Sequence, residues 1–236
     1  MSKSFIFDVD GTLTPSRGRI DEDFRLWFAQ FCWDNDVYMV TGSDKAKTVE
    51  QVGEYIYNLC KRVYQCAGND IWEQDNNIKK PAFMTLPDIA EEYLDRQLNY
   101  TDWVPLTGAH SDYRPGLLNF SIVGRNATLE QRKMYSDYDK QVKERSRIAQ
   151  AFNKRFPQYQ ASVAGEIGID ITVKGCNKSQ ILKDFDECID DIVFFGDKCE
   201  DGGNDYEIAQ AVAFGGGIVR QVKDWKDTWI KLKGII

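Results

Sequence analysis

The chain has 236 residues, and 30 Lys and Arg against 37 Asp and Glu give a net charge of −7, which disfavours nucleic acid or an anionic membrane as a partner. Its 42% hydrophobic and 28% charged residues are ordinary for one or two globular domains. A single histidine, His110, excludes a site built from several histidines, and the six cysteines form no C-x-x-C pair typical of zinc.

The first third of the sequence alternates between short apolar runs and amphipathic segments. Residues 4–7 and 37–40 are runs typical of buried parallel strands, and 62–66 is a third candidate. Apolar spacing predicts a helix between the first two strands, through Phe24, Trp27, Phe28 and Phe31. A second helix is predicted with one apolar face, formed by Val49, Val52, Ile56 and Leu59. This alternation predicts a parallel α/β sheet.

The middle third has a different pattern, after a break marked by Asn76-Asn77 and Pro81. We predict a helix over 85–98, extended chain over 112–124, and one long polar helix over 129–155 with a capping box of Thr128 and Gln131. Residues 161–173 alternate apolar and polar side chains, as half-buried antiparallel strands do. This pattern therefore predicts an inserted α+β domain.

After Gly175 the first pattern returns. We predict a helix through Ile181, Leu182 and Phe185, a buried strand at 192–195, a short strand at 211–214, and a closing helix through Val219, Val222, Trp225, Trp229 and Leu232. The predicted organisation is a discontinuous core domain over residues 1–80 and 176–236, with the inserted domain over 81–175.

The chain start gives no sign of a secretory leader, because the short apolar run after Ser4 ends at Asp8. No apolar stretch approaches the ~20 residues that a membrane span needs. We therefore expect a cytoplasmic protein whose cysteines are reduced thiols, most of them buried.

Carboxylates follow two of the predicted strands. Asp8 and Asp10 stand in Asp8-Val9-Asp10-Gly11-Thr12 after the first strand, and Asp197 follows the strand at 192–195, with Asp205 soon after it. Ligands of parallel sheets bind at the carboxyl ends of strands, so these groups are expected to converge. Converging carboxylates repel one another, and a hard cation such as Mg²⁺ resolves this. The alternative is that the motif is a solvated turn.

Other residues at strand ends favour phosphoryl transfer over a solvated turn. Thr41-Gly42-Ser43-Asp44 follows the second strand, and Lys178 follows the inserted segment. A hydroxyl, an ammonium group and a metal beside a carboxylate nucleophile form a phosphoryl-transfer site.

These motifs, in this order, resemble those of the haloacid dehalogenase superfamily, and within it the capped eukaryotic-type phosphomannomutases. The similarity is carried by Phe7 to Arg17, by Phe194-Phe195-Gly196-Asp197-Lys198 with Gly202 to Ile208, and by Tyr113 to Arg125 with Gln131-Arg132. It implies a Rossmann-like α/β core with a C2b-type α+β cap. The implied activity interconverts hexose 1-phosphate and 6-phosphate, with mannose phosphate favoured, for GDP-mannose biosynthesis.

The resemblance also implies a role for each matching residue. Asp8 would be the nucleophile, and Asp10 the general acid/base and a metal ligand through its backbone carbonyl. Ser43 and Lys178 would hold the transferring phosphoryl group, and Asp8, Asp10, Asp197 and Asp205 would form the Mg²⁺ site. The sugar phosphate would be bound by Arg17, Arg114, Asn119, Arg125, Arg132 and Asp170. A hexose 1,6-bisphosphate activator and a homodimer through the caps are implied as well.

The cap arginines also have a physical rationale. A mutase must hold a second phosphate away from the metal, and guanidinium groups bind phosphate oxygens in pairs. The alternative is a solvated charged face, paired with Glu130 or Asp112.

Two stretches depart from the family pattern: Cys66-Ala67-Gly68-Asn69-Asp70 stands where Glu-Asn-Gly is usual, and Gly168 where a phosphate-binding Ser is usual. A sugar-phosphate phosphatase with the same nucleophile, and more remotely a non-catalytic binding protein, are the alternative functions.

Overall fold

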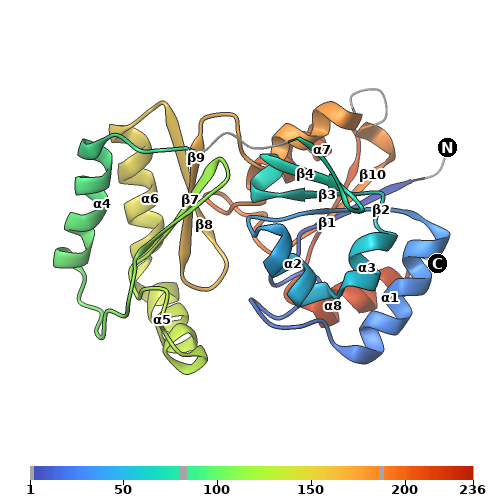
Figure 1. The fold of residues 1–236 in the computed structure, drawn as a ribbon, viewed down its shortest axis with the longest axis horizontal. Coiled ribbons are helices and arrows are strands. Elements are labelled where there is room, and N and C mark those ends of the chain that lie inside the picture. Colours follow the sequence, from blue (N-terminus) through green and yellow to red (C-terminus); the bar gives the residue numbers. More distant parts are fainter. Residues whose placement is uncertain (1–2, 80–83, 186–188, 236) are drawn as a thin grey trace.

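The computed structural model describes residues 3–79, 84–185 and 189–235, which form two lobes, each built around one β-sheet (Figure 1). The larger sheet has the strand order β11-β10-β1-β2-β3-β4-β5. Five neighbouring strands are parallel: Ile218–Gln221 (β11), Ile192–Gly196 (β10), Ser4–Phe7 (β1), Asp36–Val40 (β2) and Arg62–Gln65 (β3). The parallel α/β prediction is therefore confirmed.

An antiparallel hairpin completes the larger sheet beyond the parallel strands. Asp70–Glu73 (β4) pairs with β3, and Asn76–Lys79 (β5) pairs with β4. The break predicted at Asn76-Asn77 is therefore wrong, since both residues belong to β5. Pro81 lies outside the described residues.

Helices bury both faces of the larger sheet. Phe5 and Phe7 of β1 pack on one face with Glu22–Asp34 (α1), Lys45–Val52 (α2), Glu54–Leu59 (α3) and Trp225–Lys233 (α8). Ile6 packs on the other face with Tyr206–Phe214 (α7) and the 3₁₀ segment Lys178–Phe185. Short 3₁₀ turns at Cys66–Gly68 and Ile189–Asp191 lie beside the sheet strands. Because both faces of the sheet are buried, consecutive residues of β1 are apolar on both sides of the strand.

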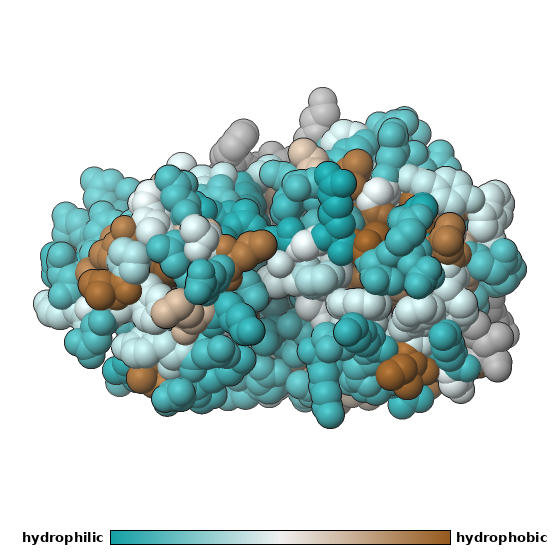
Figure 2. Space-filling view, turned by 90° about the horizontal axis from the view of Figure 1, so that it is seen from below, coloured by the Kyte–Doolittle hydropathy of each residue, from teal (hydrophilic) through white to brown (hydrophobic). Residues whose placement is uncertain are grey.

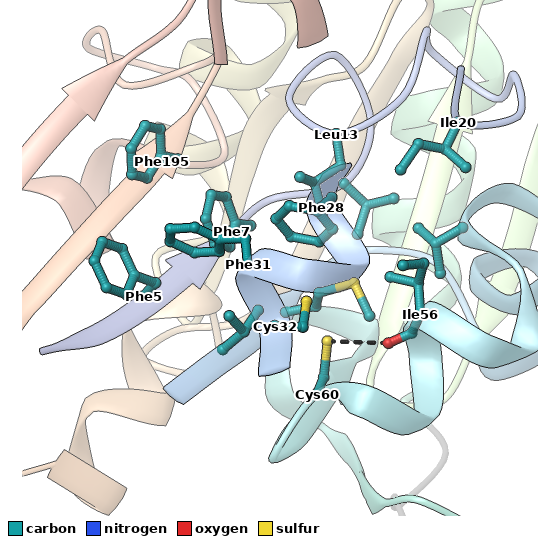
Figure 3. Packing of buried hydrophobic residues seen from close by; sticks show 14 of the residues in the cluster. Phe5, Phe7, Leu13, Ile20, Phe28, Phe31, Cys32, Ile56, Cys60 and Phe195 are labelled. Atoms are coloured by element: carbon teal, nitrogen blue, oxygen red, sulfur yellow. Dashed lines mark hydrogen bonds between the residues drawn. The ribbon is translucent and has the colours of Figure 1, made fainter. Parts of the chain in front are cut away.

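Aromatic packing fixes the end of β1. The ring of Phe7 stacks on Phe195 of β10 with centroids 4.9 Å apart and meets Phe28 of α1 edge-on at 5.2 Å (Figure 3). Such aromatic pairs contribute about 0.5–1.5 kcal/mol beyond their buried area. Asp8 therefore follows a strand whose position is set by two neighbouring elements.

The smaller sheet is antiparallel, with the strand order β6-β7-β9-β8. Its strands are Ser111–Arg114 (β6), Leu117–Ser121 (β7), Gly168–Val173 (β9) and Tyr159–Ala164 (β8). It forms a second core with Asp88–Tyr100 (α4), Leu129–Val142 (α5) and Glu144–Arg155 (α6). In Figure 1, α4 and α6 lie on the side of this sheet away from the larger lobe. The predicted antiparallel strands and the Thr128–Gln131 capping box are confirmed.

Strand β8 also contacts the larger lobe directly. The Val163 N–H donates to the Gly202 carbonyl at 2.8 Å, and the Asn204 N–H donates to the Val163 carbonyl at 3.1 Å. These two bonds form an isolated bridge between Val163 and Gly203. The turn that leads to Asp205 is therefore hydrogen-bonded to the smaller lobe.

Two predicted helices are wrong in extent. The helix through Val49 and Leu59 is interrupted by Gly53, whose φ of 81° suits glycine and separates α2 from α3. The long helix over 129–155 is interrupted by Lys143, whose φ of 55° separates α5 from α6.

Three predictions near the C-terminus are wrong in type. Residues 211–214 belong to α7 and not to a strand, and Val212 is the one buried residue of this run, since Phe214 is 97% exposed. A four-residue apolar run does not by itself distinguish a strand from a helix turn. The strand follows as β11 and includes Val219, so the closing helix begins only at Trp225. The segment with Ile181 is 3₁₀ and not an α-helix.

The molecular surface agrees with the ordinary composition of the chain. On the face shown in Figure 2, residues are mainly hydrophilic, and hydrophobic residues form small separate groups. No described helix combines the length and apolarity needed to span a bilayer. The described cysteines have free thiols, and Cys32, Cys60, Cys66 and Cys199 are buried, whereas Cys188 lies outside the described residues.

Candidate active site

Three carboxylates come together at the carboxyl end of the parallel sheet. Asp8 follows β1, Asp197 follows the adjacent β10, and Asp205 precedes α7. The two strand ends are joined directly, since the Asp8 N–H donates to the Phe195 carbonyl at 2.9 Å. One side-chain oxygen from each of the three residues lies within 4.8 Å of the others. The structure thus brings together the carboxylates that the sequence placed at separate strand ends.

The ammonium group of Lys178 lies between two of these carboxylates. Its Nζ donates to Oδ1 of Asp8 at 2.5 Å and to Oδ1 of Asp205 at 2.7 Å. Burial lowers the pKa of Lys178, but the charges of Asp205 and Asp8 outweigh burial and hold this pKa above its ordinary value. Lys178 is therefore charged and balances part of the carboxylate charge.

The remaining negative charge shows in the carboxylate pKa values. Burial raises the pKa of Asp8 well above its ordinary value, and Asp205 and Asp197 add to this effect while Lys178 opposes it. Burial also raises the pKa of Asp197 to about 7, with Asp205 as the next cause. Surplus charge on clustered oxygen ligands fits a hard divalent cation such as Mg²⁺. The part predicted for Asp10 in this site involves its backbone carbonyl and stays a prediction.

Loops after β1 and β2 supply the other groups of the larger lobe. Ser43 is buried after β2, and its N–H donates to Oγ1 of Thr41 at 3.0 Å. Asp10 is half-buried, and its Oδ1 accepts the Arg17 N–H at 2.5 Å. Together with Asp8, the residues Asp10, Arg17 and Ser43 line one pocket.

The smaller sheet forms the opposite wall through its strand register. Asn119 of β7 is paired with Asp112 of β6 on one side and Asp170 of β9 on the other. The Asn119 Nδ2 donates to Oδ1 of Asp170 at 2.6 Å, and the Asn119 Oδ1 accepts from Nη1 of Arg125, also at 2.6 Å. Burial raises the pKa of Asp170, and Arg114 and Asn119 oppose this. Three polar side chains on neighbouring strands therefore form one connected network.

Two arginines share a carboxylate in this network. Nη2 of Arg114 and Nη2 of Arg125 donate to the same Oδ2 of Asp112, at 2.7 and 2.6 Å. Nη1 of Arg114 reaches the larger lobe and donates to the Gly42 carbonyl at 2.8 Å. Burial and the charge of Arg114 lower the pKa of Arg125 to about 10. The predicted alternative of a solvated face is wrong, because both guanidinium groups are largely enclosed, but the pairing with Asp112 that this alternative named is confirmed.

Arg132 is the least satisfied cation of the pocket wall. It is 5% exposed, and its Nε has no hydrogen-bond partner among the described residues. Its nearest acidic oxygen is Oε2 of Glu166, 3.9 Å from Nε. Burial and the charges of Arg17 and Arg125 lower the pKa of Arg132 to about 10. A buried guanidinium with an unpaired N–H in a pocket is suited to an anionic ligand.

The pocket between the lobes has a volume of about 390 Å³. Ten of the twelve predicted site residues line it: Asp8, Asp10, Arg17, Ser43, Arg114, Asn119, Arg125, Arg132, Asp170 and Asp197. The other two, Lys178 and Asp205, are buried and reach the pocket through their contact with Asp8. Sequence reasoning missed Lys47, Glu50 and Glu166, which also line it, and it named Asp112 only as a pairing partner of the cap arginines. For Asp112, its position two residues before Arg114 on one strand face was an available signal.

Of the departures from the family pattern, Gly168 lies in the wall of this pocket, whereas residues 66–70 lie next to a contact between the lobes and do not line the pocket. Cys66 and Ala67 form a tight turn with φ of 51° and 59°, and Nδ2 of the adjacent Asn69 donates across the lobes to the Gly116 carbonyl at 3.3 Å. A β-carbon on Gly168 would lie 2.5 Å from Nδ2 of Asn119. The Asn119 amide therefore occupies the space next to position 168.

Comparison with known proteins agrees with this geometry. The chain matches the family model of eukaryotic phosphomannomutases over residues 30–236. The phosphomannomutase of Saccharomyces cerevisiae is 32% identical over 213 residues, which are 86% of this chain and 83% of that protein. That of Galdieria sulphuraria is 34% identical over 214 residues, covering 87% and 84% of the two chains.

A solved haloacid dehalogenase subclass IIB sugar phosphatase has the same fold. It aligns over 100% of both chains with a TM-score of 0.58 and 17% identity. This likeness concerns the fold alone, whereas the family model matches residues 30–236 and the two sequence relatives cover 86% and 87% of the chain. The chain belongs to the eukaryotic phosphomannomutase family.

Proposed function

We propose that this protein is a phosphotransferase that interconverts hexose 1-phosphate and hexose 6-phosphate, with mannose phosphate favoured. The observation that carries the proposal is a pocket with two opposite anion-binding walls. One wall holds Asp8 with Lys178, and the other holds the buried arginines around Arg132, whose Nε lacks a partner among the described residues. A hexose carrying phosphate at one end and a reacting hydroxyl at the other fits between two such walls.

The reaction would proceed through an aspartyl phosphate. An Asp8 carboxylate oxygen attacks one phosphorus of a hexose 1,6-bisphosphate, the bond from phosphorus to the sugar oxygen breaks, and Asp10 gives its proton to that oxygen. In the other half the free hydroxyl of a hexose monophosphate attacks the phosphoryl group on Asp8 while Asp10 takes the hydroxyl proton, which regenerates the bisphosphate. Ser43 and Lys178 hold the phosphoryl oxygens during both transfers.

Asp8, Asp197 and Asp205 would hold Mg²⁺, with the backbone carbonyl of Asp10 as a further ligand. When bound, the ion balances negative charge on the transferring phosphoryl group. The support is the cluster of buried oxygens with raised carboxyl pKa values, which Lys178 neutralises only in part.

The wall opposite Asp8 would hold the phosphate that does not react, together with the sugar hydroxyls. Arg114, Arg125 and Arg132 supply guanidinium groups, and Asn119 and Asp170 supply hydrogen bonds, while Arg17 contacts the ligand from the core side. Each hydrogen bond between a charged group and this phosphate would stabilise the complex by roughly 1.5–3 kcal/mol. Closure of the two walls on the substrate keeps water from the aspartyl phosphate.

Several finer assignments belong to the same proposal. A hexose 1,6-bisphosphate would activate the enzyme, because Asp8 must be phosphorylated before it can phosphorylate a monophosphate. The core would comprise residues 1–80 and 176–236 and the cap residues 81–175, a division supported by the two separate sheets. A homodimer through the caps, a cytoplasmic location and a role in GDP-mannose biosynthesis complete it, supported by family membership and, for location, by the free thiols.

Product analysis tests the proposed function. The protein is incubated with mannose 1-phosphate, Mg²⁺ and a trace of hexose 1,6-bisphosphate, and products are followed by phosphorus NMR. Mannose 6-phosphate supports the mutase, whereas free phosphate as the main product identifies a phosphatase. Asp8→Asn is the matched control, because an amide cannot form the aspartyl phosphate. Turnover that persists in this variant would rule out Asp8 as the nucleophile.

A further inference from the structure

The last turn of α2 places Gln51 beside Asp10. Gln51 is 1% exposed, and its Nε2 donates to Oδ1 of Asp10 at 3.0 Å and to Oγ1 of Thr14 at 3.1 Å. Its backbone carbonyl accepts the Ile20 N–H at 2.8 Å. Both the backbone and the side chain of Gln51 are therefore tied to the loop that follows β1.

The hydrogen bonds to Asp10 are asymmetric. The Arg17 N–H and the Gln51 Nε2 both donate to Oδ1, and no described residue donates to Oδ2. Arg17 reaches this contact with a φ of 57°, a backbone conformation that is uncommon for a side chain of its size. The protein thus anchors one oxygen of the carboxylate and leaves the other for a ligand in the pocket that Asp10 lines.

The other end of the Gln51 amide gives a second, independent observation. Its Oε1 is buried and has no hydrogen-bond partner within the described ranges. A buried oxygen without a hydrogen-bond partner destabilises the fold, so an amide at position 51 reduces stability unless its N–H group has a purpose. The contact that its N–H group makes with Asp10 accounts for a polar residue at this position.

We infer that Gln51 is a positioning residue that orients Asp10 so that Oδ2 meets the reacting sugar oxygen. This inference rests on the proposed function, in which Asp10 transfers the proton of that oxygen. Helix α2 has eight residues, begins next to Ser43 and ends beside Gln51. One short rigid element therefore sets both the phosphoryl-binding loop and the orientation of the general acid/base.

The test compares substrates that need the proton with one that does not. Gln51→Leu removes the amide N–H group that donates to Asp10 and Thr14, and the leucine side chain has a similar size. Phosphorylation of Asp8 is followed by rapid quench in wild type and variant, with a hexose 1,6-bisphosphate and with 2,4-dinitrophenyl phosphate, both with Mg²⁺. The sugar alkoxide needs protonation as it leaves, whereas the dinitrophenolate does not. We expect a loss of about 10–100-fold with the bisphosphate and less than about threefold with the aryl phosphate.

Thr14→Val is the matched control, because it removes the other acceptor of Gln51 and leaves the contact with Asp10 intact. This variant should stay within about threefold of wild type on both substrates. Gln51→Met, which is unbranched, replaces Gln51→Leu if the latter does not fold. Equal losses on both substrates, or no loss with the bisphosphate, would overturn the positioning role. Failure of the proposed function is distinct, since wild type itself would then form no phosphoenzyme from the bisphosphate, or would transfer its phosphoryl group to water and not to mannose 1-phosphate.

Discussion

Position 168 shows how a single residue shapes the pocket wall. Gly168 leaves room for the Asn119 amide, which connects Asp170 to Arg125. A serine at this position, usual in the family, would need the same space. At this position the protein therefore has the hydrogen-bond network around Asn119 in place of a hydroxyl group. A side chain at position 168 would displace that network.

Gly168→Ser is expected to weaken substrate binding, although it restores the usual family residue. Displacing Asn119 breaks at least one hydrogen bond to a charged group, at a cost of about 1.5–3 kcal/mol. The KM for mannose 1-phosphate should rise by about tenfold or more. Asn119→Ala is the control, because adding Gly168→Ser to it should raise KM little further once the clash is absent. A lower KM in the single variant would show that Asn119 can move aside without weakening substrate binding.

Asp197 predicts how stability depends on pH in the absence of metal. Its pKa is 3.8 ordinarily and about 7 when folded, so the folded protein holds more protons than the unfolded chain between about pH 4 and pH 7. The stability contributed by this group is therefore lost as pH rises through that window. Added Mg²⁺ should raise the Tm more at pH 7.5 than at pH 5, because the metal needs the deprotonated ligand.

Thermal unfolding with EDTA or Mg²⁺, across pH, measures this effect. Asp197→Asn is the comparison, since it removes the titrating group and one metal ligand. The variant should show a smaller fall in Tm with pH and a weaker response to Mg²⁺. A wild-type response to Mg²⁺ that does not change with pH would argue against metal binding by these carboxylates.

Residues at strand ends could be predicted from sequence, because the topology of a parallel sheet itself brings such positions together. Asp8, Asp197 and Ser43 are found in this way. Gln51 could not, because its importance lies in a contact with Asp10 that only the folded chain creates. A polar residue on a helix is usually solvated, so the position of Gln51 carried no signal.

At the scale of elements, a buried ion pair joins α5, α6 and the turn between β8 and β9. Oδ2 of Asp139 accepts from Nε of Arg145 at 2.8 Å, and Oδ1 accepts the Arg145 N–H at 2.9 Å. Nη1 of Arg145 also donates to the carbonyls of Ala164, Gly165 and Gly168. These three residues line the pocket, so the helix junction supports the pocket wall.

Arg145→Met should destabilise the protein by about 3–5 kcal/mol, because Asp139 would stay buried without its partner. The double variant Asp139→Leu with Arg145→Met leaves no unpaired charge and should be less destabilised than the single variant. Urea unfolding at constant pH provides the free energies for this comparison. If the two single changes simply add, the side chains do not interact as described.

The same junction shows why helix boundaries were missed. Lysine is not a residue type that favours the left-handed conformation, so the identity of Lys143 does not predict the break between α5 and α6. The amphipathic pattern continues across it, because the buried residues of both helices belong to one core. Gly53 did provide a signal, but apolar residues on both sides concealed the break.

At the scale of the whole molecule, the two pocket walls belong to separate sheets and make different demands on a substrate. Both walls line the pocket. In the proposed function the carboxylate wall would bind the reacting phosphoryl group, and the arginine wall would bind the rest of the ligand. A small aryl phosphate engages only the first. A hexose phosphate engages both, so the two substrates separate the contributions of the lobes.

Arg125→Ala should therefore impair mannose 1-phosphate far more than p-nitrophenyl phosphate. Loss of one charged contact predicts a fall of about 10–100-fold in kcat/KM for the sugar phosphate. Hydrolysis of the aryl phosphate should change little, and both are measured under steady-state conditions with Mg²⁺. Lys140→Ala, at an exposed site on α5, serves as the control for charge removal in the same lobe. Equal losses on the two substrates would assign Arg125 to folding.

The bridge between β8 and the Gly202–Asn204 turn makes lobe separation visible to hydrogen exchange. The amide protons of Val163 and Asn204 are bonded across the lobes, so they exchange with solvent whenever the lobes part. Amides inside the β7–β9 pairing exchange only when the sheet itself opens. A sugar phosphate that holds the lobes together should slow the first pair and leave the second unchanged. Because Asn204 adjoins Asp205, we expect each opening event to loosen the turn that carries a carboxylate of the site, and we expect product release to follow such events.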